Sequence, residues 1–410
     1  MNNGGGLNME LLKQELYKIF SKKYLFLILA LMLLFTYGFD LVTAIKGPTE
    51  NKYNYAKQFE GEISKEKKEK IYNLFKSNEK KDKDSEITSV YEWILGSYTE
   101  QERPRFVAIA DFLKEADPLF KNEKLDKRFH DFKGYKLNEL NKNLKSLKKS
   151  GKENTYEYKN KSIASNMYKK LSKPKFFYMD SWNYIYGYNI DSNIVIVVTM
   201  LLLGISPIFS EEYKTKVATI ILSSKKGRRE CVRAKILASI IYAIFVAFIC
   251  NFISIIIITK IYGIQGFNAP MQCLGEFSCS PYKFTVLQFF STLFFTSLIG
   301  SILFVLLILI ISNITKSSMM TFFISGFVFV FPMLVQKVMG MTNVWWKKPL
   351  ISLSITQILD GRGGIYDVFS TINIFGKPVL YPYFILIYSI ILGALLVCIL
   401  YRRLKYEEIN

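Results

Sequence analysis

The sequence predicts an all-α polytopic membrane protein with six transmembrane helices. Three features predict this fold: six apolar segments nearly free of charge, a Lys-rich polar insert between the first and second of them, and a short amphipathic segment before the first. Apolar runs of about 18 residues or more are long enough to cross a bilayer as helices, and water-soluble cores seldom contain them. We expect the spans at residues 24–45, 193–210, 235–259, 284–311, 318–335 and 383–401.

Residues 1–23 are expected to form a cytoplasmic leader and an amphipathic elbow helix. Residues 1–8 include three consecutive glycines and carry no folding signal, whereas residues 9–23 place apolar side chains at helical spacing opposite Lys and Glu. Such a helix lies in the membrane interface. A simple membrane anchor would have the same pattern. The apolar positions of the elbow are Leu12, Leu16, Ile19 and Phe20.

The polar insert, residues 46–191, has the size of a single domain. The stretches 55–75 and 136–149 are charged and helix-prone, so we expect a mainly helical extracellular domain. Two roles stay open for it. One is a cap or stalk, and the other is a domain whose basic face contacts a substrate, a partner or anionic lipid at the outer leaflet.

The distribution of Lys and Arg predicts the orientation, because basic residues in short loops face the cytoplasm. They are dense at 13–23, 214–235 and 402–405 and sparse in the loops 260–283 and 338–382. Both termini are therefore expected in the cytoplasm, with the insert and those two loops outside. The region 192–410 carries the second to sixth spans. This asymmetry explains the net charge of +20 without nucleic acid as a partner.

Several residues near the predicted outer surface were assigned structural roles. Asp40, close to the outer end of the first span, is expected to be an interfacial carboxylate. Cys273 and Cys279 share an outer loop, and their spacing leaves open whether they form a disulfide. Aromatic side chains before the second span and after the fifth are expected to form anchoring belts at headgroup level. They are Phe176, Phe177, Tyr178, Trp182, Tyr184, Tyr186, Tyr188, Trp345 and Trp346.

The chain lacks the motifs that carry catalysis or nucleotide binding. No GxxxxGK[ST], GxGxxG or HExxH sequence occurs, and a single histidine without paired cysteines predicts no metal site. The span interiors contain almost no ionisable side chains, which disfavours an ion-coupled transporter and an intramembrane enzyme. We therefore expect no enzyme and no cofactor in this chain.

The cytoplasmic segment 211–235 has an unusual order of features. It opens with paired carboxylates, continues with a short stretch of helical pattern, breaks at 223–227 and ends in a basic cluster. A loop that obeys the positive-inside rule explains the basic residues, but not the acidic start or the glycine break. The residues assigned to coupling here are Glu211, Glu212, Ser223, Ser224, Arg228, Arg229 and Lys235.

This segment resembles the cytoplasmic loop between the second and third spans of ABC-2 type exporter permeases. That family places an acidic residue after the second span, then a short helix, a Ser/Thr-rich turn, an Arg and a Lys that opens the third span. The elbow helix, the six spans and an outer hairpin between spans five and six are also similar. The chain departs from the pattern at Thr215 and Lys216, where Gly and Thr are usual, and lacks the proline often placed before the Arg.

The resemblance implies a permease subunit of an ATP-driven ABC exporter in a bacterial plasma membrane. The large insert is similar to that of permeases from low-GC Gram-positive bacteria. The implied partners are ABC ATPase subunits, which bind ATP and Mg, together with a second identical or related permease and membrane lipids. The uncharged span faces favour an amphipathic or hydrophobic cargo, such as an antimicrobial peptide, a lipid or a drug. The alternative is a sensing or immunity module that detects or detaches a bacteriocin or antibiotic through the extracellular domain without transport.

Overall fold

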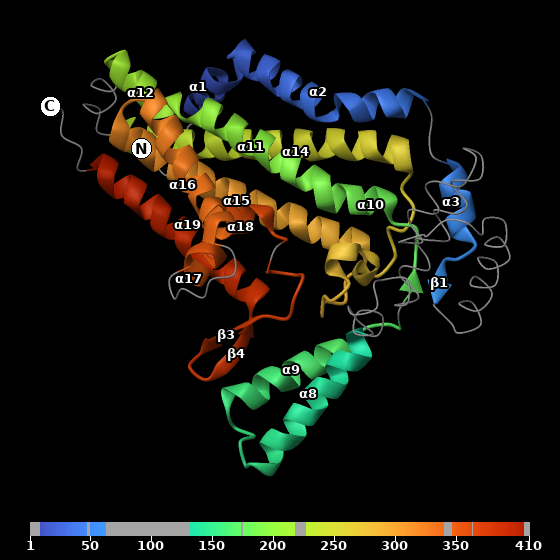
Figure 1. Ribbon diagram of the computed structural model, residues 1–410. Helices are drawn as coiled ribbons and strands as arrows, with labels where there is room; N and C mark the ends of the chain where they lie inside the picture. The colour runs from blue at the N-terminus through green and yellow to red at the C-terminus, as the bar shows by residue number, and fades with distance from the viewer. Residues whose placement is uncertain are drawn as a thin grey trace.

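The protein is mostly helical (Figure 1). Within the residues that the structure describes, five helices are long and apolar enough to cross a membrane, and the number rises to six if the bent pair α1 (Met9–Phe20) and α2 (Lys23–Lys46) makes one span. These helices define a multi-pass membrane protein. The computed structural model describes residues 9–46, 50–62, 132–173, 175–217, 227–339, 347–362 and 364–405.

The five candidate spans are close to their predicted positions, apart from the start of the one expected at residue 193. The segment predicted as the first span lies in α2, which follows α1 at an angle of 53° between the two helices. The second belongs to a continuous helical run from Asp180 to Lys214, which begins well before the predicted residue 193. The elements of this run are α10 (Asp180–Tyr184), the π-helical turn η2 (Ile185–Asn189), α11 (Ile190–Ile205) and α12 (Pro207–Lys214). The other candidate spans lie in α14 (Gly227–Tyr262), α15 (Val286–Thr315), α16 (Ser318–Met339) and α19 (Tyr381–Lys405).

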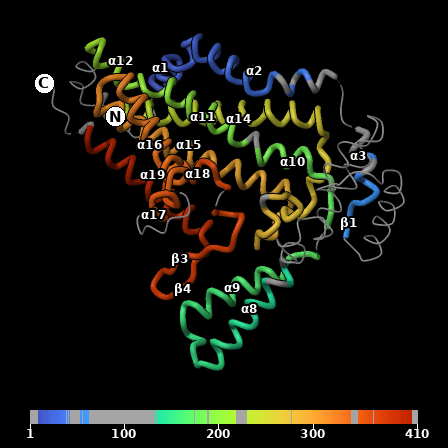
Figure 2. The backbone as a smooth tube through the Cα atoms, in the orientation of Figure 1, coloured from blue at the N-terminus to red at the C-terminus, as the bar shows by residue number. Residues whose placement is uncertain are grey.

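The bundle has two distinct ends. In Figure 1, α1, α12 and the end of α19 lie at one end, and α3 (Glu50–Lys57) and β1 (Gly61–Glu62) lie at the other. We call these the α1 end and the α3 end. The tube in Figure 2 shows α8 (Phe132–Lys149) and α9 (Tyr156–Lys169) as a pair beside the α3 end. Strand β1 pairs antiparallel with β2 (Lys175–Phe176), with Gly61 opposite Phe176.

The segment between α16 and α19 folds back against the bundle. Its short helices are α17 (Lys347–Ser352) and α18 (Ile355–Asp360), and α18 packs against α15. The approach is close because Gly300 of α15 has no side chain: a Cβ there would lie 2.5 Å from Leu359 Cα. A β-hairpin follows, formed by β3 (Thr371–Ile374) and β4 (Lys377–Leu380). The remaining elements are the 3-10 turns η3 (Met271–Cys273) and η4 (Gly275–Phe277).

The insert agrees with the prediction in one of its two helix-prone stretches. Residues 136–149 lie in α8, as expected. The helix expected at 55–75 is confirmed only for residues 55–57 and is wrong for 58–62, because α3 ends at Lys57 and β1 follows at Gly61. Gly61 has a φ of 106°, a conformation that interrupts a helix and that glycine adopts at little cost. Residues 63–75 lie outside the described part of the chain.

The aromatic belt expected before the second span is wrong for most of its members. Phe176, Tyr178, Trp182 and Tyr186 are buried inside the protein. The indole of Trp182 donates to the carbonyl of Gln265 at 2.8 Å, and the Tyr186 hydroxyl donates to the carbonyl of Val286 at 2.9 Å. Trp182 and Tyr186 therefore belong to a core at the α3 end that includes Met271 of the loop between α14 and α15, whereas Tyr178 packs with Ala56 of α3. Trp345 and Trp346 lie outside the described residues.

At this end the structure differs from the expectation for Asp40 and answers the question that the sequence left open for Cys273 and Cys279. Asp40 is buried and accepts a hydrogen bond from the Tyr184 hydroxyl at 2.8 Å, so it is a helix-helix contact. Cys273 and Cys279 are both thiols, with no disulfide between them. The Cys273 thiol faces the carbonyl of Lys175 at 3.3 Å, whereas the Cys279 thiol lies 3.9 Å from the Ser278 hydroxyl. The two sulfur atoms therefore contact different polar groups and not each other.

Candidate functional site: a buried charge network

Four charged side chains from three helices meet at the α1 end of the bundle. Glu15 and Lys18 come from α1, Glu212 from α12 and Lys235 from the beginning of α14. We refer to these four residues as the charge network. They connect helix α1, which contains the predicted amphipathic segment, with residues 211–235, to which the sequence analysis assigns coupling.

Each ammonium group of the network contacts both carboxylates. Lys235 Nζ lies 3.1 Å from Glu15 Oε2 and 2.5 Å from Glu212 Oε1. Lys18 Nζ lies 2.7 Å from Glu15 Oε1 and 3.0 Å from Glu212 Oε1. Two negative and two positive charges therefore alternate in a closed group with no net charge.

Because the charge network is largely buried, its stability depends on each of its four residues. The side chain of Lys235 is 1% exposed and that of Glu15 is 5% exposed, while Lys18 is half exposed at the edge. Phe209 places its ring 5.4 Å from Lys235 Nζ, a cation–π distance. Partial burial alone would lower the pKa of Lys18, but the carboxylates of Glu15 and Glu212 raise it above the ordinary lysine value. Removing one partner from such a group leaves an uncompensated buried charge.

The amphipathic pattern of α1 explains how Glu15 reaches this position. Leu12, Glu15 and Ile19 follow one another at intervals of three and four residues, so they share one helix face, and all three are buried. Phe20 continues this face and packs edge-on against Tyr242 and Phe245 of α14. Helix α1 is therefore docked on α14 through its apolar side.

Outside the charge network, α12 is joined to three more helices. The hydroxyl of Ser312 in α15 donates to the carbonyl of Ser206 at 2.7 Å, and Ser210 and Ser318 share a hydrogen bond of 2.5 Å. These contacts connect the end of the second span to α15 and α16. Tyr213 adds a link to α19, because Asn313 bonds both the Tyr213 hydroxyl and Arg403.

The structure brings some of the predicted coupling residues together. Glu212 and Lys235 meet in the charge network, and Glu211 forms a separate ion pair with Lys22 at 2.9 Å. Arg228 and Arg229 lie in the first turn of α14, and their side chains are outside the described part. Ser223 and Ser224 also lie outside it.

Glu15 and Lys18 belong to the site but were not assigned to it from the sequence. The available signal was a carboxylate on an otherwise apolar helix face, between Leu12 and Ile19. A charge in that position needs a partner on the element against which the face packs. The sequence does not say which element that is, since Lys235 is 220 residues away from Glu15.

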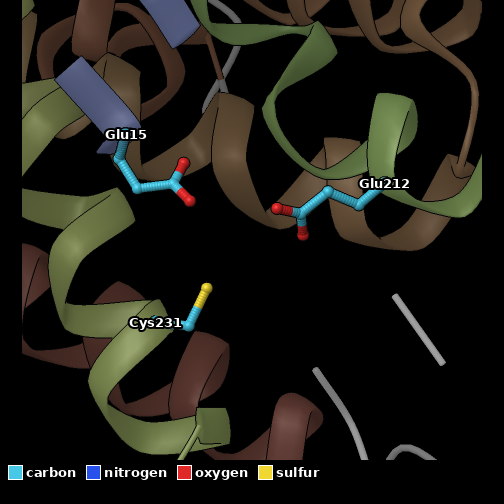
Figure 3. A group of neighbouring side chains, drawn as sticks. All are labelled: Glu15, Glu212 and Cys231. Atoms are coloured by element: carbon cyan, nitrogen blue, oxygen red, sulfur yellow. The ribbon is translucent and has the colours of Figure 1, made fainter. Parts of the chain in front are cut away.

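Three potential metal ligands lie close together within this site. Figure 3 shows the carboxylates of Glu15 and Glu212 and the thiol of Cys231 directed toward a common space. Their ligand atoms are within 4.8 Å of one another. The ammonium group of Lys235 already contacts both carboxylates and balances their charge with Lys18. A metal ion would have to displace a buried lysine, so the arrangement favours an ion-pair group.

A second charged group lies between α18 and the start of the second span. Arg362 contacts Asp360 at 2.6 Å, forms an ion pair with Asp191 and donates to the carbonyl of Tyr186 at 2.5 Å. That carbonyl belongs to the π-helical turn η2, where the regular helical hydrogen bonding changes. Arg362 thus joins the folded-back segment to the beginning of α11.

The fold and the charge network together define a multi-pass membrane protein with a tightly connected region at one end of its bundle. Comparison of the chain with models of known protein families, with curated proteins and with solved structures found no match.

Proposed function

We propose that this chain is the permease subunit of an ATP-driven ABC exporter, with the α1 end of the bundle in the cytoplasm. The ATPase subunits are separate chains, and they bind and hydrolyse ATP with Mg. A second identical or related permease completes the transport pathway. This chain itself carries out no catalysis.

The charge network is the observation that carries the proposal. An exporter needs an element that transmits motion from an ATPase to the spans. Glu15, Lys18, Glu212 and Lys235 join α1, α12 and α14 through alternating charges, and α12 is hydrogen-bonded to α15 and α16. A push on the α1 end would move these helices together, since breaking the group would expose buried charge.

The basic cluster at the beginning of α14 favours a partner whose contacting surface is acidic. Arg228 and Arg229 lie in the first turn of this helix, where the helix dipole is positive. Cations are unfavourable there unless another group compensates them. We assign these two arginines to contact with the ATPase. ATP binding closes the ATPase pair, and segment 211–235 with the elbow helix receives that motion.

The interior of the bundle supports an amphipathic or hydrophobic cargo. A narrow cavity lies between α11, α14, α15 and α18. Most of its lining is aliphatic or aromatic, and polar groups come from Asn193, Asn251, Ser297 and Asp360. The lining shows that the space between these helices is mainly apolar, but the cavity of about 30 Å³ is too small to hold a cargo molecule, so the cargo class rests on the apolar character of the helices.

Affinity purification of the tagged chain from gently solubilised native membranes tests the architecture. The expected result is co-purification of a soluble, Walker-motif ATPase in near-stoichiometric amount, identified by mass spectrometry. A known ABC complex purified in parallel verifies that the detergent preserves such assemblies. If that complex stays intact and no ATPase accompanies this chain, the exporter assignment is wrong.

Charge reversal tests the role assigned to the basic cluster. The double variant Arg228→Glu, Arg229→Glu is expected to abolish transporter-stimulated ATPase activity while the protein remains in the membrane. The matched control is Lys13→Glu with Arg402→Glu, which makes the same change in net charge at exposed positions of the same end. This control is expected to retain stimulation. Equal activity of the two double variants would contradict the role of Arg228 and Arg229.

A further inference from the structure

The turn of the β3–β4 hairpin holds an aromatic side chain in an unusual position. Phe375 is 101% exposed, and its φ of 48° lies in the left-handed region. The following Gly376 has a φ of 78°, so both central residues of this two-residue turn are left-handed. Hairpin turns of this kind favour Asn and Gly, and a bulky side chain at positive φ is rare. Within the described chain the exposed ring gains little that would offset this conformation.

The position of the hairpin indicates what the ring contacts. Strand β4 ends at Leu380 and α19 begins at Tyr381, so the turn lies a few residues before a membrane span. Tyr383, in the first turn of α19, is 63% exposed, and Ile387 and Ile390 continue the exposed apolar side of that helix. Aromatic side chains concentrate at the membrane interface. Phe375 and Tyr383 therefore lie near the same boundary between lipid and water.

The neighbouring α8–α9 pair supplies a strong positive charge. Residues 132–173 contain twelve lysines, three glutamates and no Asp, Arg or His. Each glutamate already pairs with a lysine, as in Lys136–Glu139, Lys148–Glu153 and Lys161–Glu157. Nine positive charges are thus in excess. Exposed lysines on the two helices include Lys142, Lys145, Lys149, Lys159, Lys169 and Lys170.

The hairpin and the helix pair are joined directly. Thr371 of β3 bonds Tyr156 at 2.8 Å and Asn160 at 2.6 Å, both from α9. Phe369, just before β3, packs against the small core of α8 and α9, which includes Leu140 and Tyr168. The aromatic tip and the lysine-rich helices therefore belong to one assembly next to the outer end of α19.

We propose that this assembly binds the anionic phospholipid headgroups of the adjacent leaflet, with Phe375 inserted among them and the lysines of α8 and α9 in contact with their phosphates. Two observations favour a membrane surface over a protein or a soluble ligand: the direct continuity of β4 with a span, and the excess positive charge beside an isolated aromatic tip. Each basic residue near an anionic surface strengthens binding, and this contribution decreases with salt. The proposal does not depend on an ATPase or on the cargo.

The test uses the full chain reconstituted in nanodiscs with the substitution Phe375→Trp. The emission of the introduced tryptophan is obtained by subtracting the spectrum of the parent protein. In nanodiscs that contain phosphatidylglycerol, brominated acyl chains are expected to quench most of this emission, and acrylamide is expected to quench little of it. In nanodiscs of phosphatidylcholine alone, quenching by the brominated lipid is expected to decrease.

Two variants complete the experiment. Asn154→Trp places a tryptophan in the exposed turn between α8 and α9, where acrylamide and not brominated chains should quench it. Adding Lys142→Gln, Lys145→Gln and Lys149→Gln to Phe375→Trp should lower the quenching in phosphatidylglycerol to the level of phosphatidylcholine. Free access of acrylamide to the tryptophan at 375 would overturn the proposal. Protection from both quenchers would overturn it as well, because it would place the ring against a second copy or another protein.

Discussion

Replacing Lys235 with methionine is expected to destabilise the protein strongly. Methionine retains an unbranched side chain of similar size, so the main change is the loss of the ammonium group. Glu15 and Glu212 would then share only Lys18, and one negative charge would stay buried without compensation. Breaking a buried ion pair from one side costs about 3–5 kcal/mol. The thermal unfolding midpoint of the purified protein in a single detergent measures this effect.

Two further variants distinguish the loss of charge from the loss of packing. Lys22→Met removes the partner of the half-exposed Glu211 and should cost about 0–1 kcal/mol, as exposed ion pairs do. Combining Lys235→Met with Glu15→Gln restores a neutral group and should recover part of the lost stability. Neighbouring charges are coupled, so the free energy of unfolding that the double variant loses should be smaller than the sum of the losses of the two single variants. An unfolding midpoint for Lys235→Met equal to that of Lys22→Met would contradict the buried network.

The substitution Gly300→Ala is expected to separate α18 from α15. The new Cβ would lie 2.5 Å from Leu359 Cα and 2.6 Å from Leu359 N, and backbone atoms cannot rotate away as a side chain can. Insertion of extra volume into a packed contact costs about 1–3 kcal/mol. The displaced α18 would also carry Asp360 away from Arg362. A lower thermal unfolding midpoint is therefore expected, measured as for Lys235→Met.

Gly326→Ala is the matched control for this prediction. Gly326 also lies within a predicted span, but its nearest neighbour, Leu202 Cδ1, would be 3.6 Å from the new Cβ, an ordinary contact. Alanine favours a helix over glycine by about 1 kcal/mol, so this control should be neutral or slightly stabilising. If Gly300→Ala raised the midpoint in the same way, the close approach of α15 and α18 would be wrong.

The sequence was most informative about the spans. The cores of α14, α15, α16 and α19 coincide with the predicted segments, because the length and polarity of an apolar run are local properties that a bilayer selects directly. The helical spacing of Leu12, Ile19 and Phe20 likewise predicted α1. The same reasoning was less successful for the aromatic segment before α11. It identified amphipathic rings, but it could not show that several of them would be buried inside the protein.

The charge network illustrates the boundary between local and tertiary information. The sequence by itself determined that apolar helices alternate with basic segments, that α1 is amphipathic and that Glu212 and Lys235 flank a basic segment between two apolar ones. Only the tertiary structure decided that Glu15 and Lys18 join them, that Cys273 and Cys279 have separate neighbours and that Gly300 receives the backbone of α18. The physical reason is that hydropathy acts on each segment alone. The pairing of buried charges and the fit of helix surfaces depend instead on residues of different helices, between 23 and 220 positions apart in the sequence, which meet only after the helices have packed.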